Sequence, residues 1–271
     1  MAYQIGLIGG GNMGSAMLNG IIQGGVCPAS DIIVAEKREQ ARTALSDRFG
    51  IHVTPSAQDA AAAQIVILAV KPAQLTDALA EIRDQIGPDQ IVVSIVAGQS
   101  IQTIEDGLVS IKTVGKLKVV RVMPNTPALT GSGMSALSPN AALTPEDTDR
   151  ILAIFNSFGR AALIPESQMD IVTGLSGSSP AFIYMLIEAM ADAAVAQGFP
   201  RDLSYEFAAQ TVMGSARMVL ETGEHPGRLK DAVCSPGGTT IAGVLALEET
   251  GFRASIAAGI TAAIERSREL G

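Results

Sequence analysis

Two patterns of apolar residues divide the chain near residue 164. Before that point, short runs rich in Ile and Val alternate with longer segments in which apolar residues return at helical spacing. Runs that are apolar at nearly every position are typical of strands buried on both faces of a parallel sheet, and the helical segments are typical crossover connections. The pattern therefore predicts an α/β fold with a doubly wound sheet over residues 1–164.

The expected elements of this first region alternate along the chain. Strands are predicted at residues 4–8, 32–35, 65–70, 91–96 and 118–122, with two further short runs at 133–137 and 160–164. Helices are predicted at residues 15–24, 40–50, 73–86, 101–107 and 144–158. The last helix has a favourable start, because Thr144 is a good N-cap, Pro145 fits the first turn, and two acids follow at the positive end of the helix dipole.

The strand pattern ends at Pro165, and the rest of the chain is typical of helices separated by Gly and Pro. These helices are expected at residues 180–198, 202–222, 239–250 and 252–270. The first is apolar on every side and carries only Glu188 and Asp192 as charges, which predicts a buried helix. An all-helical C-terminal domain over residues 165–271 cannot easily hide it alone, so we expect two copies of the chain to intertwine.

A glycine motif follows the first predicted strand. It has the form Gly9-x-Gly11-x-x-Gly14, with Asn12 and Met13 before the last glycine, and a helical pattern begins directly after it. In dinucleotide sites the first glycine permits a tight turn, the second lets the backbone approach the pyrophosphate, and the third lets the helix pack on the strand. The free N–H groups of the helix start face the anion. We therefore expect a dinucleotide site in a Rossmann-like domain, with a glycine-rich turn that binds nothing as the alternative.

Further residues are expected at this site because ligands of doubly wound sheets lie outside the carboxyl ends of the strands. Glu36 follows the second predicted strand and lies 22 residues past Gly14, near the offset of about 20 that is typical of a ribose-binding carboxylate. Lys71 is expected to approach the nicotinamide ribose or the pyrophosphate, with an exposed turn lysine as the alternative. The other residues placed at this edge are Lys37, Arg38, Ala69, Val70, Pro72, Ala97 and Gly98.

The residues after the second predicted strand favour two different cofactors. The Glu36 carboxylate would accept a hydrogen bond from a free 2′-hydroxyl and favour NADH. Lys37 and Arg38 would neutralise a 2′-phosphate and favour NADPH. The sequence leaves this preference open.

A second loop offers backbone amides to an anion in the helical region. Ser235-Pro-Gly237-Gly238 runs into a helix at Thr239 and Thr240, and such a helix start suits a small carboxylate. The alternative is a plain turn with an N-cap. Two other loops also have a functional and a structural interpretation. Residues 174–180 would admit a close approach of backbone or cofactor, or would form a plain helix start. Asn125 is placed to orient a ligand or to cap its turn.

Composition excludes several classes of partner. The net charge is −8, with the densest basic group at Lys112, Lys116 and Lys118 interpreted as a solvated loop edge, so nucleic acid is not expected. Cys27 and Cys234 form no disulfide or metal pattern. No apolar run approaches the roughly 18 residues of a membrane span, and the expected location is the cytoplasm. With hydrophobic residues at 47% and charged residues at 17%, part of the surface is expected to lie against another subunit.

Five ordered blocks resemble the pyrroline-5-carboxylate reductase family. They are the Gly-x-Gly-x-Met-Gly start, Ala-Val-Lys-Pro, Met-Pro-Asn-Thr-Pro, Gly-Leu-Ser-Gly-Ser, and the run from Val233 through Cys-Ser-Pro-Gly-Gly-Thr-Thr to Gly243. The resemblance covers nearly the whole chain. It implies a Rossmann domain, a helical dimerisation domain, and hydride transfer from NADPH or NADH to the C=N bond of 1-pyrroline-5-carboxylate, the last step of proline synthesis.

The resemblance also implies roles for individual residues. The amides of the signature loop (Ser235, Gly237, Gly238 and Thr239) and Thr240 would hold the substrate carboxylate and ring nitrogen, and Glu166 would lie near the substrate. Homodimers that assemble further, often to decamers, are implied as well. Two departures stand out: Ala232 replaces an asparagine that some relatives place near the cofactor, and Ser179 replaces a glycine in the Gly-Ser-Gly-Pro loop.

The residue types favour an imine over an alcohol as substrate. Alcohol oxidation needs a base such as His or Lys, but His52 lies near an early strand, and His225 lies in a turn where capping or packing is expected. A protonated imine is already electrophilic, so positioning supplies much of the catalysis. The alternatives are a 3-hydroxyacid dehydrogenase of the 6-phosphogluconate type, disfavoured by the absence of lysine from 174 to 198, and a non-catalytic NAD(P) sensor. Subunit number, feedback by proline, a related imino acid as substrate, and the subunit that completes each pocket stay open.

Overall fold

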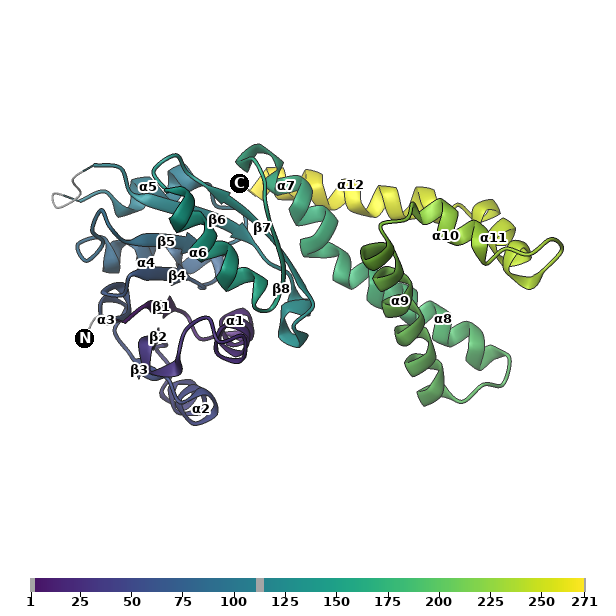
Figure 1. Cartoon of the computed structure of the whole chain (residues 1–271), viewed down its shortest axis with the longest axis horizontal. Coiled ribbons are helices and arrows are strands. Elements are labelled where there is room, and N and C mark those ends of the chain that lie inside the picture. Colours follow the sequence, from purple (N-terminus) through teal and green to yellow (C-terminus); the bar gives the residue numbers. More distant parts are fainter. Residues whose placement is uncertain (1–2, 111–114, 271) are drawn as a thin grey trace. The chain divides into compact units, whose positions relative to one another are not determined.

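The computed structural model describes residues 3–110 and 115–270 and divides into two compact units (Figure 1). Unit 1 is Met1–Gly177 together with Ala263–Gly271, and unit 2 is Ser178–Ala262. The chain therefore crosses from one unit to the other twice. The functional domain boundaries expected from the sequence, 1–164 and 165–271, stay a prediction.

Unit 1 contains a sheet that, within the described residues, has eight strands in the order β3-β2-β1-β4-β5-β6-β7-β8. All neighbouring strands are parallel except β6 and β7. The strand order reverses between β1 and β4, which is the switch point of a doubly wound sheet, so the predicted fold class is confirmed. The strands are β1 Ile5–Ile8, β2 Ile32–Ala35, β3 His52–Thr54, β4 Ile65–Leu68, β5 Ile91–Ser94, β6 Lys118–Met123, β7 Gly133–Pro139 and β8 Gly159–Leu163.

Helices cover both faces of the sheet. Alternate residues of each strand point to opposite faces, so Leu7 joins the apolar cluster that contains α1 and α6, whereas Ile8 joins the cluster beneath α4 and α5. The α-helices of unit 1 are α1 Asn12–Gln23, α2 Glu39–Phe49, α3 Ala57–Ala61, α4 Leu75–Ile82, α5 Ile101–Leu108, α6 Pro145–Asn156 and α7 Met169–Val172. Four short 3₁₀ turns accompany them within the described residues: η1 Ala29–Asp31, η2 Pro72–Gln74, η3 Thr126–Thr130 and η4 Glu166–Gln168.

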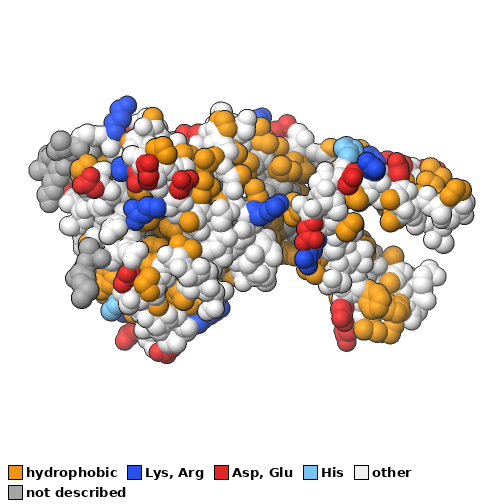
Figure 2. Space-filling model, viewed as in Figure 1, with side chains coloured by type: hydrophobic (Ala, Val, Ile, Leu, Met, Phe, Trp, Pro, Cys, Tyr) orange, Lys and Arg blue, Asp and Glu red, His pale blue; other side chains and the backbone are white. Residues whose placement is uncertain are grey.

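Unit 2 is helical throughout. It contains α8 Ser179–Ala196, α9 Arg201–Thr222, α10 Pro226–Ala232, α11 Thr239–Glu249 and most of α12 Phe252–Leu270, whose last turns belong to unit 1. Among the described residues of unit 2, only Ala191, Ser204 and Ala208 are buried. Large apolar side chains lie on the surface, including Met185 at 67% and Phe207 at 61% exposure, and Figure 2 shows apolar atoms spread over these helices.

Several predicted elements need correction. The loop expected at residues 174–180 is helical instead, because Thr173–Ser178 form a π-helical turn that joins α7 to α8. The helix expected at 73–86 is shorter, since the 3₁₀ turn η2 precedes α4 and α4 ends at Ile82. The short elements β3, α3, α7 and α10 were not predicted.

One helical stretch, Glu166–Ala196, is long and apolar enough to cross a membrane by length and composition. This corrects the expectation that no segment approaches such a span. Only 6% of its most apolar window is buried within the chain. The helix predicted to be buried at residues 180–198 is therefore exposed in the single chain, so another surface has to bury its apolar side chains.

Candidate active site

The carboxyl ends of four neighbouring strands are level with one another. In the sheet register, Ile8 pairs with both Ala35 and Leu68, and Leu68 pairs with Ser94. The segments that follow these strands therefore emerge at one edge of unit 1. The structure thus brings together the predicted cofactor residues 9–14, 36–38, 69–72 and 97–98.

The glycine motif has the geometry of a close turn. Gly9 has a φ of +106°, and a β-carbon there would lie 2.5 Å from the carbonyl oxygen of Ala69. Gly11 is exposed and is the N-cap of α1, and no described atom would lie within 4 Å of a β-carbon on it. Within the described residues no side chain caps α1. The N–H groups of its first turn, which includes Asn12, Met13 and Gly14, are therefore available to an anion.

Glu36 and Arg38 form an ion pair at the end of β2. The Arg38 Nε atom lies 3.0 Å from Glu36 Oε1, and the Arg38 backbone N–H also donates to this oxygen. Partial burial raises the pKa of the Glu36 carboxyl, but the hydrogen bonds and charge of Arg38 outweigh it and hold the pKa below its ordinary value. Lys37 is exposed and lies 3.8 Å from Glu81. A carboxylate and two cations thus stand together where the 2′ position of the ribose is expected.

The remaining strand-end residues have less defined roles. Lys71 is exposed at the N-cap of η2, between half-buried Val70 and exposed Pro72. Its position suits both a cofactor contact and an exposed turn lysine. Ala97 is exposed, and Gly98 has a φ of +72°.

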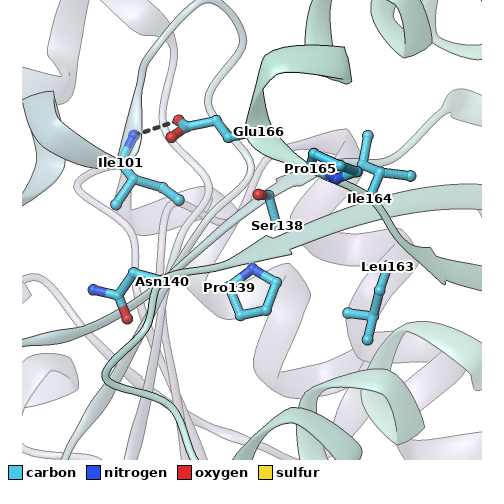
Figure 3. Close-up of a pocket in the computed structure, with 8 residues that line it drawn as sticks. All are labelled: Ile101, Ser138, Pro139, Asn140, Leu163, Ile164, Pro165 and Glu166. Carbon is cyan, nitrogen blue, oxygen red and sulfur yellow. Dashed lines mark hydrogen bonds between the residues drawn. The ribbon is translucent and has the colours of Figure 1, made fainter.

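Glu166 lines a cavity of about 580 Å³ within unit 1 (Figure 3). Its Oε1 atom accepts a hydrogen bond from the Ile101 N–H at 2.7 Å and lies 3.3 Å from the Arg121 guanidinium. No sequence motif predicted Arg121, although a lone arginine inside the apolar run of β6 is a signal of a buried ion pair. The cavity is lined by Ile101, Ser138, Pro139, Asn140, Leu163, Ile164, Pro165 and Glu166.

The second predicted anion loop lies in unit 2. Gly237 has a φ of +67°, and the Gly238 N–H donates to the Ser235 carbonyl oxygen, which closes the turn. Gly238 is the N-cap of α11, and Thr239 and Thr240 form its exposed first turn. No side chain in the described parts of the chain caps this helix. The amides of its first turn are therefore available to an anion.

Several other residues singled out in the sequence have structural roles. His225 caps α10 by accepting a hydrogen bond from the Gly227 N–H, which confirms the expected capping. Asn125 uses both ends of its amide internally, toward Met134 and Ser176. Lys118 is not a solvated loop residue, because it lies in β6 and pairs with Asp147 at 2.7 Å. Lys112 lies outside the described residues.

Family models match both parts of the chain. One described as pyrroline-5-carboxylate reductase dimerisation matches residues 166–270, and one described as NADP oxidoreductase, coenzyme F420-dependent, matches residues 4–98. With the strand-end geometry, they define an NAD(P)H-dependent oxidoreductase that binds NADP(H), acts on a small molecule and self-associates through its helical C-terminal part.

The chain belongs to the pyrroline-5-carboxylate reductase family. It is 50% identical over 271 residues to the pyrroline-5-carboxylate reductase of Escherichia coli, covering 100% of this chain and 99% of that protein. A pyrroline-5-carboxylate reductase structure from Coxiella burnetii is similar with a TM-score of 0.91 and 32% identity, over 100% of this chain and 99% of that one. A Plasmodium falciparum pyrroline carboxylate reductase with NADP bound has a TM-score of 0.85 and 32% identity, over 99% and 98%.

Proposed function

We propose that this chain reduces the C=N bond of 1-pyrroline-5-carboxylate to L-proline with NADPH. Its full-length similarity to reductases of that name carries the proposal. The bound nicotinamide would supply a hydride to the imine carbon, and the ring nitrogen would keep its proton, so NADPH, a proton and the imine yield proline and NADP⁺. The protein has to hold the two reactants in line, which alone supplies much of the rate enhancement.

The cofactor would be held at the strand-end edge of unit 1. The amides of the segment Gly9–Gly14 would bind the pyrophosphate, with Asn12 and Met13 in the first turn of α1. Lys37 and Arg38 are the residues for a 2′-phosphate, and Glu36 is the residue for a free 2′-hydroxyl. The segments Ala69–Pro72 and Ala97–Gly98 would border the nicotinamide half.

The substrate would be held by the start of α11. The amides of Gly237, Gly238 and Thr239, with Ser235, would bind its carboxylate. Thr240 would hydrogen-bond the ring nitrogen, and it is not the acid because a threonine hydroxyl is too weak an acid for that role. Glu166 would lie near the substrate from unit 1.

A second copy of the chain would bury the exposed apolar side chains of unit 2. We infer a homodimer built on α8 and α9, assembling further as far as a decamer, because exposed apolar surface of this extent marks an interface. A second copy, in place of a membrane, would then cover Glu166–Ala196. The net charge of −8 disfavours nucleic acid as a partner, and the cytoplasm is the proposed location.

A direct assay tests the activity. Purified protein with NADPH and 1-pyrroline-5-carboxylate should oxidise NADPH and form proline, and no oxidation with either NADPH or NADH would refute the proposal. Thr240→Ala should lower turnover about a hundredfold while NADPH affinity stays nearly unchanged. Thr222→Ala, at the end of α9, is the matched control and should behave like the parent. Equal loss of turnover and cofactor affinity in Thr240→Ala would contradict the role of that hydroxyl.

Charge reversal tests the 2′-phosphate assignment. The double variant Lys37→Glu with Arg38→Glu should raise the KM for NADPH about a hundredfold and that for NADH far less, because it places like charges beside the phosphate. Arg150→Glu, an exposed arginine bound to Gln64, is the control. Equal damage with both cofactors would mean that the phosphate lies elsewhere.

A further inference from the structure

The start of α5 is held by side chains from two distant segments of unit 1. The carboxylate of Glu166, which lies 65 residues further along the chain, accepts the Ile101 N–H at 2.7 Å (Figure 3). The same oxygen lies 3.3 Å from Arg121 in β6. A carboxylate is favoured there because a helix start carries positive partial charge and free N–H groups. Glu166 therefore connects β6 to the start of α5.

Arg121 is held in the sheet, where its guanidinium needs a carboxylate partner. It is only 9% exposed, and in the sheet register it lies between two buried serines, Ser94 on β5 and Ser138 on β7. The Glu166 side chain is 34% exposed, so the pair itself is partly open to solvent, but loss of the carboxylate would leave the nearly buried guanidinium unpaired, which is costly. The position of Glu166 is thus set by a fixed charge in the sheet.

The loop that α5 follows is one of the predicted cofactor segments. This cofactor loop, residues 95–100, contains Ala97 and Gly98. Its first residue is held by the sheet, since the Ile95 N–H donates to the Leu68 carbonyl oxygen. Its last residue, Ser100, caps α5 by accepting the Thr103 N–H. The loop therefore connects β5 to the start of α5, and a fixed position of Ile101 also fixes the C-terminal end of the loop.

We propose that Arg121 and Glu166 are positioning residues for the cofactor loop. Arg121 sets the Glu166 carboxylate, the carboxylate sets Ile101 and the first turn of α5, and that turn sets Ala97 and Gly98 against the cofactor. The role rests on the proposed function, because it takes the loop to border the nicotinamide. It differs from a direct contact between Glu166 and the substrate, because it acts when no substrate is present.

NADPH affinity without substrate is the decisive measurement. Glu166→Gln keeps an acceptor for the Ile101 N–H but loses the charge that holds Arg121, and Arg121→Met removes the cation. Each should raise the NADPH dissociation constant, measured by cofactor fluorescence, about fivefold. The NADPH dissociation constant of the double variant should be about the same as that of either single variant, since both substitutions remove the same interaction. Arg121→Lys keeps a charge and should recover part of the loss.

Hydrogen exchange separates positioning from general destabilisation. Amides of residues 97–104 should exchange faster in Glu166→Gln and Arg121→Met, while those of α1 stay protected. The matched control is Asp147→Asn, because Asp147 also pairs with a basic residue of β6 and accepts an N–H at a helix start. It should leave the NADPH dissociation constant and residues 97–104 unchanged.

Two results would overturn the proposal. In one, Glu166→Gln raises the KM for 1-pyrroline-5-carboxylate with NADPH affinity unchanged, which would make Glu166 a substrate contact only. In the other, Asp147→Asn weakens NADPH binding as much as Glu166→Gln does. The two main measurements, the NADPH dissociation constant and hydrogen exchange, are made without substrate, so they test the proposal even if the parent protein does not turn over 1-pyrroline-5-carboxylate. Failure of the proposed function would therefore be seen separately, in the turnover assay.

Discussion

The two units bury their apolar residues in different ways. Unit 1 encloses large side chains completely, with Phe155 at 0% and Phe158 at 1% exposure in edge-to-face contact. Unit 2 buries only small residues among those described, while Met185 and Phe207 stay more than half exposed. A sheet with helices on both faces provides two closed interiors, whereas a few packed helices leave their outer faces open. The comparison indicates that unit 1 is stabilised by its own core, whereas the proposed second copy would bury the apolar side chains that unit 2 leaves exposed.

A charge on the exposed face of α8 should break this comparison most severely. Met185→Glu should leave a carboxylate unpaired in the interface of both copies, and because the change enters twice, the dissociation constant should rise by at least about a thousandfold. Sedimentation velocity measures the shift toward monomer. Val109→Glu, at an exposed apolar position of unit 1, should leave assembly intact. An assembly unchanged by Met185→Glu would show that α8 faces something other than a copy.

A cavity in unit 1 should act on folding alone. Phe155→Ala removes a fully buried ring and should lower the free energy of unfolding by about 3–5 kcal/mol. Denaturant unfolding at two protein concentrations checks it, with the same loss expected at both. Leu129→Ala, at a half-exposed position, should cost far less. A loss that vanished at high concentration would mean that unit 1 also depends on assembly.

The Lys118–Asp147 pair gives unit 1 a pH-dependent contribution. The Lys118 hydrogen bond lowers the pKa of the Asp147 carboxyl, burial opposes it, and the net pKa is below the ordinary value of 3.8. The contribution of the pair to the free energy of unfolding is therefore fully present above pH 3.8, the ordinary pKa of the carboxyl. It is lost as the pH falls through the lower pKa that Asp147 has in the folded protein. Asp147→Asn should cost about 2 kcal/mol at pH 7.

Unfolding across pH checks this prediction. The free energies of unfolding of the parent and of Asp147→Asn should become equal in acid, because the side chain at position 147 is then neutral in both proteins. A constant difference down to pH 2 would show that the pair contributes through shape and hydrogen bonding, not charge.

The smallest expected change is a gain. The Ser135 hydroxyl is buried and, within the described residues, has no hydrogen-bond partner. Ser135→Ala should therefore stabilise unit 1 by about 1 kcal/mol, because it removes an unsatisfied polar group. Thermal unfolding measures the gain. A destabilised variant would show that this hydroxyl is satisfied in solution.

Elements with a continuous apolar pattern could be predicted from the sequence, and short ones could not. The strand at 32–35 and the helix at 252–270 were found with the observed bounds, whereas β3 has three residues and α3 is mostly alanine, too short for either period to appear. The π-helical turn at Thr173–Ser178 was predicted as a loop because Gly and Ser favour turns locally, and its neighbours α7 and α8 override them.

The candidate site divides in the same way. The strand-end residues follow from chain order, because parallel strands end at one edge. The Arg121–Glu166 contact joins residues 45 positions apart and depends on the pairing of β6 within the sheet, which no local pattern specifies. The closure of the α11 loop on the nicotinamide stays a prediction for the same reason, since it joins two units.

The return of α12 to unit 1 has a practical consequence. The Ser267 hydroxyl donates to the Asp170 carboxylate at 2.7 Å, and the last turns of the helix belong to the compact unit formed by the first part of the chain. A protease that nicks the peptide bond between Gly177 and Ser178 would thus leave the C-terminal fragment clasped to the N-terminal one. The cleaved protein should migrate like the intact protein on a native gel and as two fragments on a gel run in denaturing detergent.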